Sequence, residues 1–559
     1  MAKPLKSQAA MSAGRRAQWR ALGLSEEDLL KPKIAIINSS SELAVCYAHL
    51  DGVAKVVKDT IRAAGGIPFE VRTTAPSDFI INAAYTGGYI LPSRDLVTND
   101  IECQVGAAML DGMVCLSSCD KTPPGHLMAA GRLDIPSITV VGGYQKSGEL
   151  NGEPVDVEDV FLEQVHVRIG RPGNRDLNAM ADVAIQGPGV CAGMATANSM
   201  AVVCEALGMT LPGNAPVAAN SRTMFDYARR AGTRIVAMVE EDLTARKVMT
   251  KESFLNAVAA VLAVCGSINC VKHLQAIAVE TGVDVDIFGL FRELTGKIPV
   301  LSAIRPNGND RIDDFDRAGG ARAVLKQLLP LIEPDAMTVT GKTLRENLES
   351  YEVANPEVIR PLTNVYTMKA PIVILKGSLA PESAIAKMGL RTDGDRPETF
   401  DGPAIVYETG PAAIEGLAKG EVKPGQVLIA RNQGVRGGPG MSGGAASIVF
   451  AVDGAGLGGQ IAFITDGQLS GLCNKGLTIA EVSPEAATGG PISLVRDGDR
   501  ITVDIEAGSI ELHVEEEELA RRRAEPVRPL ATPPTGWLSL YREQVQPMSR
   551  GAVMRPTGA

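Results

Sequence analysis

The spacing of apolar residues in the first half of the chain alternates between two periods. KIAIINSS, residues 33–40, is a short apolar run of the kind that forms a buried strand. In HLDGVAKVVKDTIRAAGG, residues 49–66, the apolar positions from Leu50 to Ala64 recur at helical spacing and a Gly-Gly pair follows them. The pattern therefore predicts a strand followed by a helix.

The same alternation continues further along the chain. GMVCLSS (112–118) and SITVVGG (137–143) are two more predicted strands, and LMAAGRL (127–133) between them is a short predicted helix. Strands that alternate with helices are typical of a parallel sheet covered by helices. In such sheets ligands bind beyond the carboxyl ends of the strands. The sequence thus predicts an N-terminal α/β domain over residues 1–365.

From about residue 370 the pattern changes to short β-branched runs separated by Gly, Asp and Pro turns. These runs are PAIVYE (403–408), GQVLIAR (425–431), IAFITDG (461–467), PISLV (491–495), RITVDI (500–505) and SIELHV (509–514). Such spacing indicates a β-rich second domain, which we place at residues 366–559 with a linker at 355–371. EEEELARRRAE (515–525) is predicted to be an exposed charged helix.

Composition narrows the class of protein. With 559 residues the chain is long enough for two or more domains, and its net charge of −10 gives no basic footprint for nucleic acid. No charge-free run of about 18 apolar residues is present, so no membrane span is expected. The N-terminus lacks an apolar signal core, which makes the cytoplasm the expected compartment. The nine scattered cysteines do not form the pattern of a disulfide framework.

The stretch SSCDKTPPG, residues 117–125, carries the first candidate chemistry because it directly follows a predicted strand. Cys119, Asp120 and Lys121 permit three interpretations. They form a buried cysteine beside a surface Asp-Lys pair, or a nucleophilic thiol whose pKa the lysine lowers. In the third interpretation they are metal ligands, since thiolate suits iron and carboxylate oxygen suits magnesium. Spacing alone leaves all three open.

Other candidate residues also lie at turns. Cys46 and Cys191 fall where a strand gives way to a helix, but no CxxC pattern links them to Cys119. Ser470, in TDGQLSG after the strand IAFI, is either an exposed reactive hydroxyl or a turn-forming serine. The five histidines make no HExxH or Cys-His ligand pattern, which argues against a zinc hydrolase. A nucleotide-binding enzyme stays a weaker hypothesis, because the Gly-rich stretches match no phosphate-binding motif.

Taken together, these stretches resemble the dihydroxy-acid dehydratase and phosphogluconate dehydratase family, which includes aldonic acid dehydratases. CDKTPPG is similar to its first signature, and FITDGQLSG with VSPEAATGGPI is similar to its second. Further similar segments, in the same order, are RRAQWRALGL, LPSRD, GVCAGMATANSM, CGSIN and GGPGM. The resemblance implies an α/β domain beside a β-barrel-like domain, with the active site between them.

The resemblance also implies two inorganic cofactors. An iron-sulfur cluster would be held by Cys46, Cys119 and Cys191, leaving one iron with an open coordination position. A cysteine at position 46 favours a 2Fe-2S cluster over 4Fe-4S. A magnesium ion would be bound by Asp78, Asp120 and a carbamylated Lys121, an oxygen ligand that magnesium prefers.

The implied reaction is the dehydration of a 2,3-dihydroxy carboxylic acid to a 2-keto acid. Ser470 would be the base that takes the C2 proton, which requires nearby cations to lower its pKa. Asn198, Ser267 and Asn269 would line the substrate pocket or make buried hydrogen bonds. The substrate would be a branched dihydroxy acid such as 2,3-dihydroxyisovalerate, an aldonic acid such as gluconate or xylonate, or both. The family usually forms homodimers or homotetramers.

Two departures from the family pattern affect these expectations. Where the family commonly has a glutamate that binds magnesium, this chain has Gly443, two residues after GGPGM and beside Ser442. In the second signature Gln468 and Leu469 replace the usual arginine and a bulkier apolar residue. These changes predict a divergent subgroup that acts on sugar acids. Gly443 also supports the alternative that the chain is a degenerate member that binds or senses without catalysis.

Overall fold

The N-terminal half is built on a four-stranded parallel sheet. Its strands follow the order β2-β1-β3-β4 and are β1 (Lys33–Asn38), β2 (Ile67–Arg72), β3 (Gly112–Ser117) and β4 (Ser137–Val141). The computed structural model describes residues 5–81, 88–173, 175–388, 390, 398–438, 444–473, 476–525 and 535–555. All residues of β1, β3 and β4 are buried, so these continuous apolar runs occupy the covered centre of the sheet.

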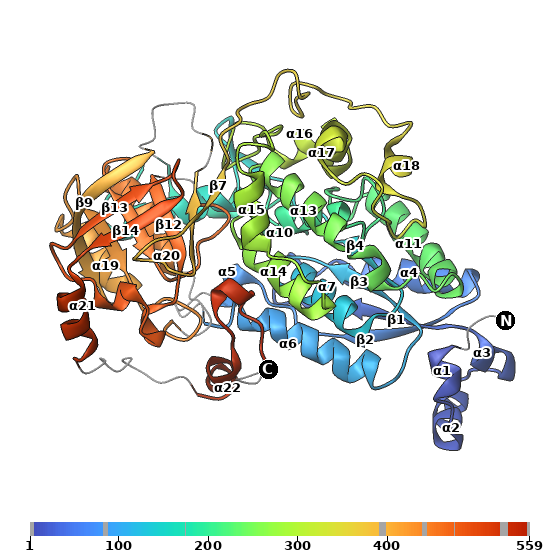
Figure 1. Ribbon diagram of the computed structural model, residues 1–559. Coiled ribbons are helices and arrows are strands. Elements are labelled where there is room, and N and C mark those ends of the chain that lie inside the picture. The colour runs from blue at the N-terminus through green and yellow to red at the C-terminus, as the bar shows by residue number, and fades with distance from the viewer. Residues whose placement is uncertain are drawn as a thin grey trace.

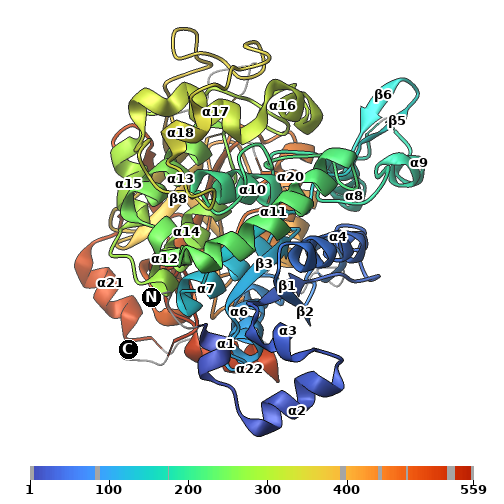
Figure 2. The ribbon, with the colours of Figure 1, turned by 90° about the vertical axis from the view of Figure 1, so that its right-hand side faces the viewer.

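Helices cover both faces of this sheet. One face is covered by α4 (Leu50–Ala63), which packs on β1 and β2, and by α11 (Arg222–Glu240), which packs on α4, β3 and β4. The other face is covered by α7 (Thr122–Leu133), which is backed by α6 (Pro92–Ile101) and α14 (Asn269–Thr281). Figures 1 and 2 show this layering. The predicted N-terminal α/β architecture is confirmed.

Further helices surround this core. Between β4 and α10 (Thr196–Ala206) the chain makes an excursion through β5 (Gly148–Leu150), β6 (Glu153–Val155), α8 (Val157–Arg168) and α9 (Leu177–Val183), which projects from the molecule in Figure 2. Next come α13 (Lys251–Ala263), α15 (Ile287–Leu294), α16 (Ile312–Ala318), α17 (Gly320–Leu328) and α18 (Leu344–Leu348). The N-terminal segment holds α1 (Lys6–Ala9), α2 (Ala13–Ala21) and α3 (Glu26–Leu30). None of the described helices has the length and apolar character required to cross a bilayer.

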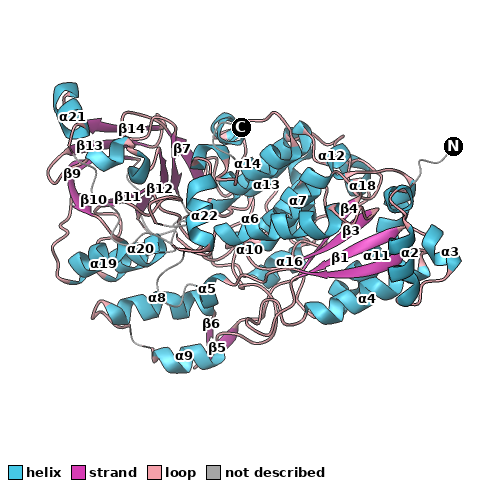
Figure 3. Cartoon of the chain, turned by 90° about the horizontal axis from the view of Figure 1, so that it is seen from below, coloured by secondary structure: helices cyan, strands magenta, loops and turns pink. Residues whose placement is uncertain are grey.

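The C-terminal half is built on a mixed eight-stranded sheet ordered β14-β13-β9-β10-β11-β12-β8-β7. Its strands are β7 (Ile372–Leu375), β8 (Ser383–Lys387), β9 (Thr399–Tyr407), β10 (Val427–Ala430), β11 (Ala462–Thr465), β12 (Leu477–Ser483), β13 (Arg500–Asp504) and β14 (Ser509–His513). A bridge between Lys376 and Ser509 joins the two edges, so the sheet is nearly closed. The predicted barrel-like C-terminal half is confirmed, and Figure 3 shows the two groups of strands at opposite ends.

Helices connect the central parallel strands of the second sheet. They are α19 (Gly410–Ala418), between β9 and β10, and α20 (Gly444–Gly454), between β10 and β11. The charged segment predicted at 515–525 does form a helix, α21 (Glu516–Arg523). The strand predicted at PISLV is wrong, because Pro491–Leu494 form a 3-10 turn that buries Ile492 and Leu494. A short apolar run does not distinguish a strand from a buried turn.

The end of the chain returns to the N-terminal half. Helix α22 (Trp537–Gln544) buries Tyr541 against Leu91. The Arg94 guanidinium donates to the carbonyl of Ala552 at 2.7 Å. The main buried cluster also runs without interruption from β1 to β14. The two halves are therefore packed together around a common interior.

Candidate active site

The candidate site begins at the switch point of the parallel sheet. Strands β1 and β3 are neighbours, but the chain leaves them in opposite directions, toward β2 and β4. A crevice opens at the carboxyl ends of two strands related in this way. Cys46 lies in the loop after β1 and Cys119 directly follows the end of β3. The Ser118 hydroxyl donates to the Cys46 carbonyl at 2.5 Å and so ties the two loops together.

The thiols of Cys46 and Cys119 contact each other. Their hydrogen bond lowers the pKa of Cys46, while the same bond and burial hold the pKa of Cys119 far above its usual range. Cys119 has a φ of +60°, a left-handed conformation that is uncommon outside glycine and often marks a functional turn. Burial also raises the pKa of Cys191, and the nearby charges of Asp120 and Cys46 raise it further. The fold thus brings the three predicted cluster ligands toward the same crevice.

Lys121 lies between the two predicted magnesium carboxylates. Its Nζ is 3.4 Å from Asp78 Oδ2 and 3.8 Å from Asp120 Oδ2, and its side chain is fully buried. Burial opposes the charge of Lys121, but Asp78 and Asp120 outweigh it and raise its pKa. Burial raises the pKa of Asp78 to about 7, with Lys121 opposing this shift and Asp120 adding to it. Burial thus disfavours the charged form of Asp78 more strongly than Lys121 favours it.

These residues fit the implied cofactors in their donor chemistry. Asp78 Oδ1 is buried and accepts no hydrogen bond from any residue that the structure describes, which leaves a carboxylate oxygen available to a cation. The three thiols are soft donors of the kind that bind iron-sulfur clusters. Among the described residues, however, no three His, Cys, Asp or Glu side chains are gathered closely enough to hold an ion as they stand. Ser442 and Gly443 lie outside the described residues, so the replacement of the family glutamate is not placed.

Ser470 lies on the turn that connects β11 to β12. The backbone N–H of Leu472 donates to Ser470 Oγ at 3.2 Å, and the hydroxyl is partly exposed. Asp466, buried at the start of this turn, accepts from the backbone N–H groups of Asn432, Gln433 and Ala486. These bonds fix the turn against the neighbouring loops.

Two separate sets of hydrogen bonds hold the predicted pocket residues. Asn198 donates to the carbonyls of Cys191 and Gly193 at 2.9 and 2.8 Å, which holds the Cys191 loop. Asn269 Nδ2 donates to Thr196 Oγ1 at 2.9 Å, and Thr196 shares a hydrogen bond of 2.9 Å with Ser267. All three predicted residues are buried. Their role in substrate binding stays a prediction.

Gly471 joins the network of Thr196, Ser267 and Asn269 to the Ser470 turn. A Cβ at Gly471 would lie 2.8 Å from Ser267 Oγ and 2.8 Å from the backbone N of Thr196. Such distances are shorter than any normal contact, so only glycine allows the turn to approach α10 this closely. The fold thus places Ser470 beside the loop that carries Cys191.

The sequence analysis missed two charged residues of the site, Lys272 in α14 and Glu481 in β12. Lys272 Nζ donates to Glu481 Oε1 at 2.5 Å, and both side chains are 0% exposed. Lys272 also donates to Asn269 Oδ1, which connects the pair to the pocket network. A signal was present, because each is a lone charged residue within an otherwise buried apolar stretch.

We expect Gly471→Ala to move the Ser470 turn and reduce kcat. The added methyl must displace Ser267 or the backbone at Thr196, at a cost of about 1–3 kcal/mol in the free energy of unfolding. A displacement of about 1 Å in a catalytic group can lower the rate about 100-fold. Steady-state kinetics together with thermal unfolding measure both effects.

Gly52→Ala provides a matched control for this substitution. Gly52 is exposed in α4, and a Cβ there meets nothing within 4 Å. Replacement by alanine in a helix should raise the free energy of unfolding by about 0.5–1 kcal/mol and leave kcat unchanged. Normal kcat in Gly471→Ala would show that the close approach of the turn to α10 is unimportant.

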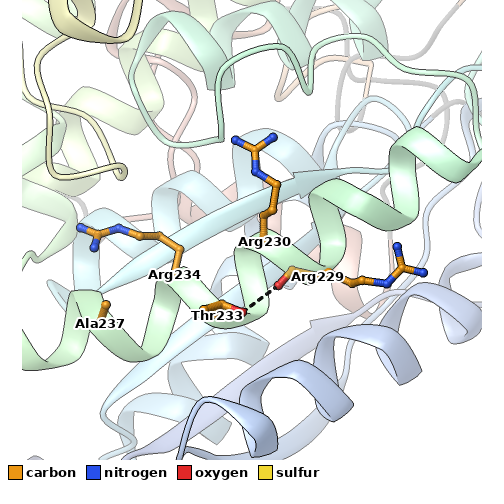
Figure 4. A pocket seen from close by; sticks show the side chains of 5 residues that line it. All are labelled: Arg229, Arg230, Thr233, Arg234 and Ala237. Atoms are coloured by element: carbon orange, nitrogen blue, oxygen red, sulfur yellow. Dashed lines mark hydrogen bonds between the residues drawn. The ribbon is translucent and has the colours of Figure 1, made fainter.

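Two concave regions of the described surface are not lined by the candidate residues. One, of about 380 Å³, lies on α11 and is lined by Arg229, Arg230, Thr233, Arg234 and Ala237. Figure 4 shows these side chains, with the Thr233 hydroxyl bonded to the Arg229 carbonyl. The other, of about 260 Å³, includes Glu382, Arg436 and Glu485. The candidate site is recognised by its converging side chains.

The chain is similar over nearly its whole length to known proteins. The model of the dihydroxy-acid/6-phosphogluconate dehydratase N-terminal region matches residues 31–347, and that of the C-terminal region matches residues 357–552. A dihydroxy-acid dehydratase from Ignicoccus hospitalis is 42% identical over 547 residues, covering 97% of this chain and 95% of that protein. The dihydroxy-acid dehydratases from Methanococcoides burtonii and Pyrococcus abyssi are 40% and 41% identical, covering 97% of this chain and 98% of each relative.

Proposed function

The chain belongs to the dihydroxy-acid/6-phosphogluconate dehydratase family, and we propose that it uses an iron-sulfur cluster and a magnesium ion to dehydrate its substrate. It is a hydro-lyase that removes water from 2,3-dihydroxy carboxylic acids to give 2-keto acids. One observation supports the cofactor proposal: the loops that follow β1 and β3 are hydrogen-bonded to each other. In this arrangement Cys46 contacts Cys119, and Lys121 lies between Asp78 and Asp120.

Specific residues would hold each cofactor. Cys46, Cys119 and Cys191 would bind a 2Fe-2S cluster. Asp78, Asp120 and a carbamylated Lys121 would bind magnesium. When bound, the two groups supply Lewis acidity to the substrate hydroxyl and carboxylate groups. In the protein without them, Lys121 is the cation that balances Asp78 and Asp120, so it must lose its proton before it can be carbamylated.

Ser470 would act as the base. Its deprotonated Oγ takes the proton from C2, the C2–C3 double bond forms and the C3–O bond breaks. The departing hydroxide then takes that proton from Ser470 and leaves as water, and the enol product tautomerises to the 2-keto acid. The N–H of Leu472 already donates to Ser470 Oγ and would stabilise its deprotonated form. Asn198, Ser267 and Asn269 would orient the substrate beside it. The network that joins Thr196, Ser267 and Asn269 keeps this wall of the pocket rigid.

The assembly and compartment are part of the proposal. We infer a homodimer or homotetramer in the cytoplasm, with no nucleic-acid partner. Exposed apolar side chains surround Cys46 and Asp78 in the sequence, namely Leu43, Val45, Phe79 and Ile80. Apolar surface of this kind is what a second copy of the chain would cover.

The direct test is formation of 2-keto acid by anaerobically purified protein loaded with cluster and magnesium. We expect turnover of at least one substrate among D-gluconate, D-xylonate and 2,3-dihydroxyisovalerate, with a loss of activity when magnesium is chelated. Protein loaded with zinc in place of the cluster serves as the control. A fully loaded protein that produces no 2-keto acid from any of the three would contradict the proposed function.

A further inference from the structure

A buried ion pair between the two halves has no role in the proposed reaction. Lys272 comes from α14 in the N-terminal half, and Glu481 comes from β12 in the C-terminal sheet. Their charged groups are 2.5 Å apart and their side chains are 0% exposed. Replacing a buried ion pair by apolar residues is often neutral for stability, so a fold does not need such a pair merely to be stable. The burial of the Lys272–Glu481 pair therefore suggests that it has a role in the active site.

Both partners are connected to the candidate active site. Lys272 donates to Asn269, which belongs to the pocket network with Thr196. The backbone N–H of Glu481 donates to the carbonyl of Gly467 at 3.1 Å, in the turn that carries Ser470. Glu481 also lies within reach of the charge of Lys121, the predicted magnesium ligand. The pair thus adjoins the proposed base, the pocket wall and the carboxylate cluster.

Three buried acceptors around Ser470 have no hydrogen-bond donor within the described part of the chain. They are Asn198 Oδ1, Gln468 Oε1 and Glu481 Oε2. Gln468 is two residues before Ser470, and the close approach of Gly471 to Thr196 brings the turn to the start of the helix that holds Asn198. Buried acceptors are normally satisfied. Unsatisfied acceptors on this turn and on the elements that adjoin it are available to a ligand that donates hydrogen bonds.

We propose that Glu481, held in place by Lys272, forms with Gln468 a subsite that accepts hydrogen bonds from substrate hydroxyl groups beyond C3. This inference rests on the proposed dehydratase function and specifies its substrate class as a polyhydroxylated acid. An ionised carboxylate only accepts hydrogen bonds, and Lys272 occupies one of its oxygens, so Oε2 is left for the substrate. A branched alkyl chain would leave these acceptors unpaired. Sites built to bond a hydroxyl discriminate strongly against analogues that lack it.

The test compares kcat/KM of the loaded enzyme for D-gluconate, D-xylonate and 2,3-dihydroxyisovalerate. We expect the better polyhydroxylated acid to exceed the branched acid by about 100-fold or more. An equal or higher value for 2,3-dihydroxyisovalerate would overturn the subsite, while the dehydratase function would stand. Absence of any 2-keto acid would instead contradict the proposed function itself.

Substitutions test whether the Lys272–Glu481 pair causes the preference for the polyhydroxylated acid. The double variant Lys272→Met/Glu481→Leu removes both charges together, which avoids leaving one buried and unpaired. We expect it to lose the preference for the polyhydroxylated acid by about 100-fold, because kcat/KM for that acid falls further than kcat/KM for the branched acid. Gln468→Leu, which leaves the ion pair intact, should lower the preference about 10-fold. Tyr541→Phe is the matched control and should change neither value, because it removes a buried hydroxyl in the C-terminal segment that has no hydrogen-bond partner among the described residues.

A binding measurement separates substrate recognition from metal binding. In the loaded Ser470→Ala protein, calorimetry should show D-gluconate or D-xylonate binding that weakens about 100-fold when the Lys272/Glu481 double substitution is added. The affinity for Mn²⁺, followed by electron paramagnetic resonance, should not change. If Mn²⁺ binding falls and binding of the polyhydroxylated acid does not, Glu481 is a metal ligand and the subsite proposal is wrong.

Discussion

Ser470→Ala is expected to lower kcat by about 100-fold to 10,000-fold, the range that a positioned general base contributes. The substitution removes the only atom on this turn that we propose to accept the C2 proton. It leaves the turn itself in place, because Asp466 and Gly471 position the backbone without the serine hydroxyl. The hydroxyl accepts one hydrogen bond and is partly exposed, so the free energy of unfolding should fall by no more than about 1 kcal/mol. Stopped assays of 2-keto acid with purified, loaded protein measure the loss.

Two further expected results distinguish a catalytic role of Ser470 from a structural one. The KM should change less than kcat, because the proposed base acts mainly in the transition state. Ser493→Ala is the matched control: its hydroxyl donates to the Gly490 carbonyl in another turn of the C-terminal half, and its loss should leave kcat unchanged. Activity of Ser470→Ala within about 10-fold of the unsubstituted enzyme would remove Ser470 from the role of base.

The regular elements of the N-terminal half were predictable from the sequence because their burial is simple. β1, β3 and β4 are covered on both faces, so each is a short continuous apolar run. α4 has one buried face, which gives the helical spacing of its apolar residues. The helix predicted at 127–133 begins earlier, at Thr122, because prolines are well accommodated in the first turn of a helix.

The candidate site was predictable only in part. The position of Cys119, Asp120 and Lys121 after a strand indicated a ligand-binding loop, but three interpretations of its chemistry fitted the spacing equally well. The resemblance to a family favours the metal-ligand interpretation, which stays a prediction; the overall similarity to dihydroxy-acid dehydratases supports the family itself. The spacing of Cys46, Cys119 and Cys191 could not show that they converge, since that depends on the order of the strands in the sheet.

The pairing of Lys272 with Glu481 could not be predicted from the sequence either, because it too depends on how distant elements are arranged in the fold. These residues are 209 positions apart in the chain, and they meet only in the folded protein, where a side chain of α14 reaches one of β12. An isolated charged residue in an apolar stretch indicates that a buried partner exists, but it does not show which residue that partner is. The acceptor subsite is therefore a property of how the halves pack, whereas the resemblance concerns motifs within each half.

Cys119→Ser is expected to abolish the iron-sulfur cluster and to lower activity by at least about 100-fold. Serine matches cysteine in shape and its hydroxyl can still bond the Cys46 thiol, so the metal-free fold should be preserved. It does not supply the soft thiolate that iron-sulfur clusters require. Loss of a direct ligand should cost more than the 10–100-fold typical of groups that only support ligands. Visible absorbance, iron content and 2-keto acid formation after anaerobic reconstitution measure the outcome.

Controls within the chain distinguish loss of a ligand from loss of a thiol in general. Cys103 is exposed. Cys204 is buried in α10, and none of the proposed cluster ligands is among the groups that shift its pKa. Cys103→Ser and Cys204→Ala should both retain the cluster, whereas Cys46→Ser and Cys191→Ser should lose it as Cys119→Ser does. Retention of full iron content in Cys119→Ser would contradict the proposed ligand set, because Cys119 is the thiol next to both Cys46 and the magnesium carboxylates. If only Cys119→Ser lost the cluster, Cys119 would stand as a ligand, and the assignment of Cys46 and Cys191 as ligands would be wrong.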